Sequence, residues 1–283
     1  MNLISTIKKS FGDWYKYIDK SKYYTVLTDD IDSYLSCLFL KKKFGIEIGG
    51  FYDFKSLYVN SEEVEGKKPI YIDGDVTTGY AFGNHVTAIY NPDCINLNKD
   101  ITSKTYSEKF AGSTFMTLLS LYDYDLTRCN EDKIFFYLMI DVWFKQYFKY
   151  RSKWDKWVNI MEMEYLNDII SYFTIEDYYD FLRQYRLNSK ISICEADGTL
   201  IFLLPYEKIK NDFGLIIPEP KQVFDTKVLD LSIVQTPLFD FFRSQKKDNA
   251  KPVFSNAMTF KDSVRYSLPI NVGSRKGDLK WTN

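Results

Sequence analysis

The sequence predicts an α/β fold with a parallel sheet in its N-terminal part, a helical connector, and a smaller α+β part at the C-terminal end. Short strand-like runs alternate with a helical run over residues 20–72, helical spacing dominates residues 113–185, and hairpin-like runs follow residue 188. The chain has 283 residues, which exceeds what one core usually fills, and 45% of them are hydrophobic. We therefore expect two domains, residues 1–188 and residues 189–283.

The first predicted unit is a strand, a helix and a second strand. Residues 23–27 are β-branched and aromatic, residues 33–44 have helical spacing that ends before Gly45, and residues 46–52 have strand character again. Residues 69–72 form a further buried-type strand after a polar stretch. Strands joined through a helix in this way are expected to lie parallel, with right-handed crossovers.

Helices are predicted for the middle of the chain. Residues 113–122 and 132–150 carry apolar side chains at helical spacing, and residues 154–185 continue mostly helical. Beyond residue 188, the runs 191–194 and 200–204 flank an Asp-Gly turn, which is typical of a β-hairpin. The helices form the connector, and the hairpin begins the second predicted domain.

Charge and composition exclude several classes of protein. The chain has 37 Lys and Arg against 38 Asp and Glu, so it has no global attraction to nucleic acid or membrane. No apolar run reaches the roughly 18 residues of a membrane span, and residues 1–15 lack the apolar stretch of a secretory signal. We expect a cytoplasmic protein without a membrane partner. The four scattered cysteines have no CxxC pair, which favours reduced thiols.

Three aspartates directly follow the first predicted strand. Asp29, Asp30 and Asp32 lie at its carboxyl end, the edge where α/β sheets hold ligands. Carboxylate clusters suit Mg²⁺ and Mn²⁺, and Asp30 and Asp32 could share ions if both side chains turn inward. The alternative interpretation is a helix N-cap, because an aspartate there satisfies free N–H groups without any metal.

A second acidic cluster and the only histidine come next. Asp73 and Asp75 follow the predicted strand at residues 69–72, and His85 comes soon after them. A single histidine is usually structural. Beside two strand-end aspartate clusters, however, it supplies the nitrogen ligand that a mixed metal site needs.

Asp141 is an acidic residue in the apolar and aromatic stretch that is predicted to be helical. A buried carboxylate without a partner is costly. Asp141 should therefore have a partner, which is either a basic side chain or a metal ion.

The order of these elements resembles the DHH phosphoesterase superfamily. Residues 28–36 resemble its first motif, with Asp30 and Asp32 at the paired aspartates. Asp73 matches the strand-end aspartate of the second motif, and residues 84–86 resemble the Asp-His-His triplet. The family includes single-strand exonucleases, nanoRNases and cyclic-dinucleotide phosphodiesterases.

The rest of the resemblance lies further along the chain. His85 stands at the metal-binding histidine of the triplet, and residues 111–114 resemble the small Ser/Thr helix start of the family. Asp141 corresponds to the later aspartate that completes the metal set. The likeness covers roughly residues 20–150 and implies a DHH-type N-terminal domain.

What the resemblance implies is hydrolysis of phosphoester bonds with Mn²⁺ or Mg²⁺. The implied substrates are short oligonucleotides, cyclic dinucleotides or single-stranded nucleic acid, and a homodimer is an open alternative for assembly. The implied metal ligands are Asp30, Asp32, Asp73, His85 and Asp141, and the first four of these are the implied catalytic residues.

The implied substrate contacts are Ser113, Thr114 and Arg265. Arg265 lies in a segment faintly similar to the strand that precedes a glycine-rich, histidine-containing segment of the family. This chain has no histidine after His85, although residues 273–277 could contact phosphate. The C-terminal part is therefore the weaker half of the resemblance.

Four departures from the family pattern change the expected metal content. Thr28 replaces the first-motif histidine, Ser33 replaces a glycine, and Asn84 and Val86 replace the outer residues of the triplet. Threonine and asparagine bind metal less strongly than imidazole and carboxylate do. One ion or none is therefore an open alternative to two, and so is a catalytically lapsed relative that binds a nucleotide or a protein partner.

Residues 143–157 interleave basic and aromatic side chains. In a nucleic-acid surface, such a pattern combines phosphate neutralisation with base stacking. An amphipathic helix with an aromatic core face and a lysine-rich solvent face gives the same pattern. The sequence leaves both interpretations open.

Overall fold

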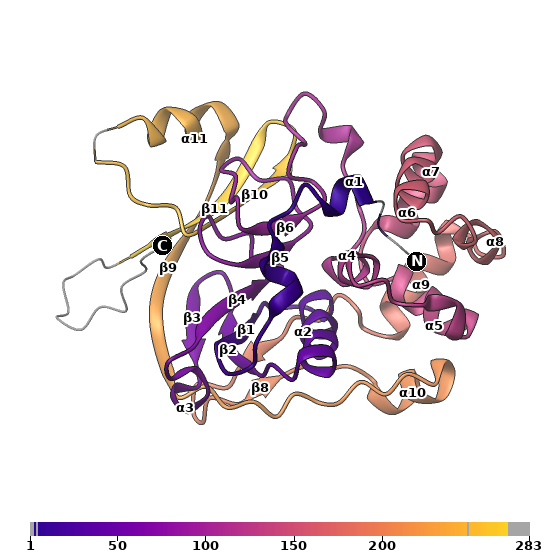
Figure 1. The fold of residues 1–283 in the computed structure, drawn as a ribbon, viewed down its shortest axis with the longest axis horizontal. Helices are drawn as coiled ribbons and strands as arrows, with labels where there is room; N and C mark the ends of the chain where they lie inside the picture. Colours follow the sequence, from indigo (N-terminus) through magenta and orange to yellow (C-terminus); the bar gives the residue numbers. More distant parts are fainter. Residues whose placement is uncertain (1–2, 4, 248, 271–283) are drawn as a thin grey trace.

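The chain folds around a nine-stranded mixed sheet with helices packed against it (Figure 1), as described by a computed structural model for residues 3, 5–247 and 249–270. The predicted α/β class is confirmed. Residues 273–277, which were predicted to contact phosphate, lie outside the described residues.

One half of the sheet is parallel, in the spatial order β2, β1, β4, β5, β6. These strands are β1 (Tyr23–Leu27), β2 (Ile48–Tyr52), β4 (Lys68–Ile72), β5 (Ala81–Gly83) and β6 (Cys94–Asn96). The predicted parallel pairing of the first three strands is confirmed. Because these strands run the same way, their carboxyl ends meet at one edge of the sheet.

The other half of the sheet is antiparallel and comes mostly from the C-terminal part of the chain. β3 pairs with β2 and with the long β9, and β11 and β10 follow beyond β9. Figure 1 shows β9 extending past β3 toward this C-terminal hairpin. The four strands are β3 (Ser56–Val59), β9 (Thr226–Pro237), β10 (Ser255–Phe260) and β11 (Ser263–Pro269).

The predicted helix at residues 33–44 is α2 (Ile31–Phe44). Asp30 caps its N-terminus by accepting a hydrogen bond from the backbone N–H of Ser33, and Gly45 ends it in the left-handed conformation at φ 71°. α2 packs against α4 (Thr114–Leu121), whose N-cap is Ser113. The predicted helix at residues 113–122 is thereby confirmed.

The single helix predicted for residues 132–150 is wrong. The structure has α5 (Glu131–Leu138) and α6 (Trp143–Lys149), separated by a turn that contains Asp141. The backbone N–H of Val142 donates to Asp141 Oδ1, at 2.6 Å, and not to a carbonyl of the preceding turn. Apolar residues continue through this turn because both sides of it face the core, so helical spacing does not reveal the break.

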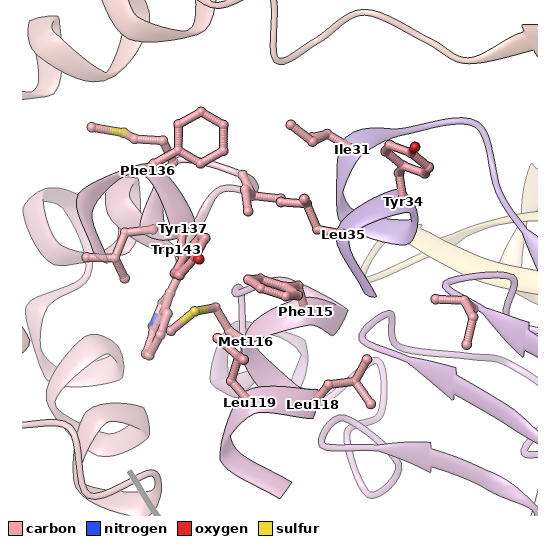
Figure 2. Packing of buried hydrophobic residues seen from close by; sticks show 14 of the residues in the cluster. Ile31, Tyr34, Leu35, Phe115, Met116, Leu118, Leu119, Phe136, Tyr137 and Trp143 are labelled. Carbon is pink, nitrogen blue, oxygen red and sulfur yellow. The ribbon is translucent and has the colours of Figure 1, made fainter. Parts of the chain in front are cut away.

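The helical connector completes one large core. Its remaining helices are α7 (Arg151–Ile160), α8 (Leu166–Ile170) and α9 (Ile175–Gln184). Figure 2 shows side chains of α2, α4, α5 and α6 directed toward one another in this core. Each buried aromatic side chain brings a large apolar area into it.

The basic and aromatic segment at residues 143–157 lines this core. Trp143, Trp154 and Trp157 are buried, and Lys145 lies 5.1 Å from the ring centre of Tyr178. The lysines extend from a helical surface whose aromatic face is already packed. This arrangement favours the amphipathic interpretation over a nucleic-acid surface.

The C-terminal part begins with the predicted hairpin, shorter than expected. It consists of β7 (Ser192–Ile193) and β8 (Leu200–Ile201), and two helices follow, α10 (Tyr206–Phe213) and α11 (Leu238–Gln245). Phe202 and Phe224 belong to the same large core as α2 and α4. The predicted boundary at residue 188 stays a prediction.

Short elements complete the part of the chain that the structure describes. They are α1 (Ser5–Lys8), α3 (Ser61–Val64), and the 3₁₀ helices η1 (Asp13–Tyr17), η2 (Tyr106–Glu108) and η3 (Leu126–Arg128). Among the described residues no helix has the length and apolar character needed to cross a membrane. The four cysteines are free thiols, as predicted.

Removing the Phe202 ring should destabilise the core shared by the two predicted domains. Phe202 is 2% exposed, and its ring meets that of Tyr34 edge-on at 5.9 Å. Phe202→Ala is expected to lower the free energy of unfolding by about 3–5 kcal/mol. Urea unfolding followed by tryptophan fluorescence tests this, because four of the five tryptophans precede residue 188.

Phe239→Ala is the matched control, because Phe239 is 77% exposed. Its effect should stay within about 0.5 kcal/mol. If Phe202→Ala left the tryptophan-detected transition unchanged, residues after 188 would have to unfold independently of the N-terminal part.

Candidate metal centre

The residues predicted from separate motifs come together at the carboxyl edge of the parallel strands. Asp32 lies within electrostatic range of Asp30 and Asp141, and Asp73 lies within range of Asp32 and His85. Asp141 also lies within range of Asp30 and His85. The edge therefore brings carboxylates from α2, the end of β4 and the α5–α6 turn to the single imidazole.

Asp32 is held by the N-terminus of α4. Its two carboxylate oxygens accept hydrogen bonds from the backbone N–H groups of Thr114, at 2.7 Å, and Phe115, at 2.8 Å. Burial raises the pKa of this carboxyl well above its ordinary value, and Asp30 and Asp141 raise it further, while the two amides lower it. Asp32 thus ties the start of α2 to the start of α4.

Asp73 directly follows β4 and has an unusual backbone conformation, with φ 56°. Its Oδ1 accepts a hydrogen bond from Thr114 Oγ1 at 2.8 Å. Burial raises the pKa of Asp73 well above its ordinary value, although His85 lowers it. Left-handed residues other than glycine are uncommon and gather at functional sites.

His85 faces two acids with one nitrogen. Its Nδ1 lies 2.6 Å from Asp75 Oδ2 and 3.8 Å from Asp73 Oδ1, but the geometry falls short of a directional hydrogen bond. Burial alone lowers the pKa of His85, yet Asp75 and Asp73 raise it more, so the net shift is well upward. The side chain stays 43% exposed.

Asp75 belongs to the cluster, although it was absent from the predicted ligand set. The residue is 4% exposed, adopts φ 45°, and has an Oδ1 without a hydrogen-bond partner. A Cβ at Gly83 would come within 2.9 Å of that oxygen, so a larger residue there would require Asp75 to shift. The spacing of two residues from Asp73 was the available signal, but a loop of unknown conformation did not show which way Asp75 points.

Asn84, which was predicted to replace an aspartate of the resembled motif, acts as a donor. Its Nδ2 donates to Gly112 O at 2.8 Å and to Asp141 Oδ2 at 3.1 Å, which leaves its Oδ1 without a partner. Burial raises the pKa of Asp141. A basic side chain or a metal ion was expected as the partner of Asp141, and the structure shows this amide and the N–H of Val142 as its hydrogen-bond donors.

Lys190 is the main addition to the predicted cluster. Its Nζ lies 2.9 Å from Asp29 Oδ1 and 3.4 Å from Asp30 Oδ2. The sequence carried no signal for this contact, because Lys190 follows Asp30 by 160 positions.

The three predicted substrate contacts lie in different places. Ser113 and Thr114 are buried: Ser113 Oγ accepts from the N–H of Met116, and both Thr114 donors point to aspartates. Arg265 is exposed on β11, paired across the sheet with Gln235 and Ala257. Phosphate contact by these residues stays a prediction, and the hydroxyl and amide of Thr114 already have protein partners.

The chemistry of this donor set fits a divalent cation, whereas its closed geometry does not. Four buried polar atoms at the edge have no hydrogen-bond partner, namely Thr28 Oγ1, Asp75 Oδ1, Asn84 Oδ1 and His85 Nδ1. Among the described residues, however, no three or more carboxylate, imidazole or thiolate groups are placed so that they could hold one ion. Ion binding therefore requires side chains to turn away from their present partners.

No protein-family model matches the chain, and searches of curated proteins and of solved structures give no match. The resemblance to the DHH superfamily and its metal chemistry therefore stay predictions.

The metal-free chain should become less stable as pH rises. Asp32, Asp73 and His85 have raised pKa values in the folded state. The stability from each is fully present below its ordinary pKa, 3.8 for the aspartates and 6.5 for the histidine, and is lost as pH rises through the folded value. Urea unfolding in EDTA from pH 5 to pH 9 should show this decline.

Asp73→Asn should flatten the decline, because an amide does not titrate. Asp240→Asn, at an exposed position, should leave the slope as in the wild type. A metal-free stability that is flat or rises over this range would contradict the electrostatic description of the site.

Proposed function

We propose that this chain is a divalent-metal-dependent phosphodiesterase or exonuclease with a DHH-like N-terminal fold. The observation that carries the proposal is the gathering of Asp30, Asp32, Asp73, His85 and Asp141 at one sheet edge. They come from four segments in the order in which the family motifs occur. The parallel order β2, β1, β4, β5, β6 supports the same assignment, since it sets the strand ends that carry these residues side by side.

Asp32, Asp73, His85 and Asp141 are the residues that would hold the ion. A bound Mn²⁺ or Mg²⁺ lowers the pKa of a water ligand and neutralises charge on phosphate oxygens. The raised pKa values of Asp32 and Asp73 indicate that this edge needs positive charge when it is fully ionised.

Thr114 holds Asp73, and the amides of α4 hold Asp32, through hydrogen bonds. Binding of an ion would require these carboxylates to turn away from those donors. His85 would ligate as the neutral imidazole, because only that form binds metal. Asp75 Oδ2 lies 2.6 Å from its Nδ1.

A groove at the far end of the C-terminal hairpin offers room for more of a substrate. Its volume is about 810 Å³, and Phe239, Phe242, Lys104 and Lys261 are among its lining residues. The N–H of Met258 donates to Val86 O, next to His85, and Lys261 follows Met258 by three residues at the turn of the hairpin. Exposed rings and lysines suit stacked bases and phosphates of a single strand.

One set of contacts favours a second candidate, a catalytically lapsed fold that binds a nucleotide or a protein partner. Lys190 and Asn84 already neutralise or bond Asp30 and Asp141. If these contacts are permanent, the fold retains its acidic edge without a metal.

Mn²⁺ should raise the melting temperature of the wild type but not of Asp73→Asn. An ion at one hundred times its Kd stabilises the native state by about 2.7 kcal/mol. For a chain of this size, the shift is roughly 5–10 °C. Differential scanning calorimetry with and without Mn²⁺ measures it, and release of mononucleotide from a short oligothymidylate measures hydrolysis.

Asp240→Asn, which removes an exposed carboxylate, should keep the full Mn²⁺ shift. A wild type that neither shifts nor hydrolyses the oligonucleotide would overturn the proposed enzyme and leave the lapsed fold. Equal shifts in wild type and Asp73→Asn would place the ion elsewhere.

Phe239→Ala combined with Lys261→Ala should weaken oligonucleotide binding, because it removes one stacking ring and one phosphate partner. Stacking is worth about 1–3 kcal/mol per base, so a loss of roughly tenfold or more in affinity is expected. Fluorescence anisotropy of a labelled oligothymidylate in EDTA measures binding without hydrolysis.

Tyr172→Ala is the control, since Tyr172 is 81% exposed in the helical connector. It should bind like the wild type. If both proteins bound equally, the groove would not be part of the substrate path.

A further inference from the structure

Two oppositely charged surfaces, both with exposed aromatic rings, lie far apart on the molecule. One is the groove beside α11, and the other is the exposed face of α8 and α9 in the helical connector. We propose that the groove docks the α8–α9 face of a second copy of this chain, so that copies associate head to tail. The inference does not rest on the proposed function, although a second copy and an oligonucleotide would exclude each other from the groove.

The α8–α9 face is acidic. Residues 161–182 contain six acidic and no basic residues. Asp177 belongs to the capping box of α9 and Asp180 forms an ion pair within that helix, whereas the other four acids have no ion-pair partner among the described residues. Within the same stretch Tyr172 is 81% exposed and Tyr179 is 42% exposed. The four unpaired acids are all exposed, and they are Glu162, Glu164, Asp168 and Glu176.

The groove and the adjoining α11 are basic. The rings of Phe239 and Phe242 line the groove, and they are 77% and 44% exposed. Two acids, Asp240 on α11 and Asp262 in the groove, offset part of the positive charge. Five cations on this surface are exposed and have no carboxylate partner in the part of the chain that the structure describes. They are Lys104 and Lys261 in the groove, and Arg243, Lys246 and Lys247 on α11 or directly after it.

Charge and ring chemistry make the two surfaces complementary. Opposite charges steer two copies together, and burial of the exposed rings supplies attraction that persists when salt screens the charges. A contact of either surface with the same surface of another copy would bring like charges together, which is unfavourable. The groove therefore fits the opposite surface of a second copy better than it fits another groove.

The positions of the two surfaces determine the kind of assembly. Figure 1 shows α8 and α11 toward opposite ends of the longest axis of the molecule, on the right and on the left. One chain therefore cannot bring its own two surfaces together. A contact between unlike surfaces leaves a free groove at one end of the pair and a free α8–α9 face at the other, so further copies add until a ring closes or the chain of copies stays open.

Sedimentation velocity of the full chain tests the inference with two variants. The groove variant is Phe239→Ala with Lys261→Glu, and the face variant is Tyr172→Ala with Glu176→Lys. All four positions are exposed, so both variants should fold like the wild type, which equal melting temperatures check.

The control is Tyr17→Ala with Glu65→Lys, which makes the changes of the face variant at two exposed positions outside both surfaces. The wild type and this control are expected to show an average mass that rises with chain concentration and falls in high salt. The groove variant and the face variant should each associate with themselves at least about tenfold more weakly.

A mixture of the two surface variants shows whether the surfaces meet each other. The groove variant keeps its α8–α9 face and the face variant keeps its groove, so together they should form a one-to-one dimer and nothing larger. A wild type that stays monomeric at chain concentrations up to about 1 mM would overturn the inference. Surface variants that associate as the wild type does, or a mixture that forms no dimer, would overturn it as well.

Discussion

The carboxylate of Asp32 bonded to two backbone amides of α4 is the contact on which the whole edge depends. Asp32 is a buried residue at the start of α2, and its two carboxyl oxygens accept hydrogen bonds from the N–H groups of Thr114 and Phe115. The hydroxyl of Thr114 then reaches Asp73 at the end of β4. Because a buried carboxylate without donors is costly, these bonds fix α2, α4 and β4 relative to one another.

The same contact resolves two interpretations that the sequence presented as alternatives. Aspartates after a strand were expected either to cap a helix or to bind a cation. Asp30 caps α2 and Asp32 accepts the first two N–H groups of α4, yet both lie in one electrostatic cluster with Asp73 and Asp141. Hydrogen bonds to helix N-termini therefore position the acids. Their carboxyl groups lie close together, and the basic side chains of Lys190 and His85 lie beside them.

Local signals predicted much of this arrangement, and long-range contacts account for what was missed. The first strand, α2 and its Gly45 terminus followed from residue type and spacing, and parallel pairing then placed Asp30 and Asp73 at one edge. Apolar spacing hid the turn at Asp141, because both flanking helices face the core. Nothing local in the sequence indicated that Lys190 would reach this edge, since its partner is set by how the connector returns to β1.

The backbone around His85 is hydrogen-bonded to a residue that lies well after the predicted domain boundary at residue 188. The N–H of Asn256, on β10, bonds Asp75 O at 3.0 Å, and its Oδ1 accepts the N–H groups of Ala88 and Ile89 at 2.6 Å and 2.9 Å. These bonds hold both loops that carry Asp75 and His85. The histidine side of the edge therefore depends on the C-terminal hairpin, so the acidic edge belongs to the whole chain even though every predicted ligand lies before residue 150.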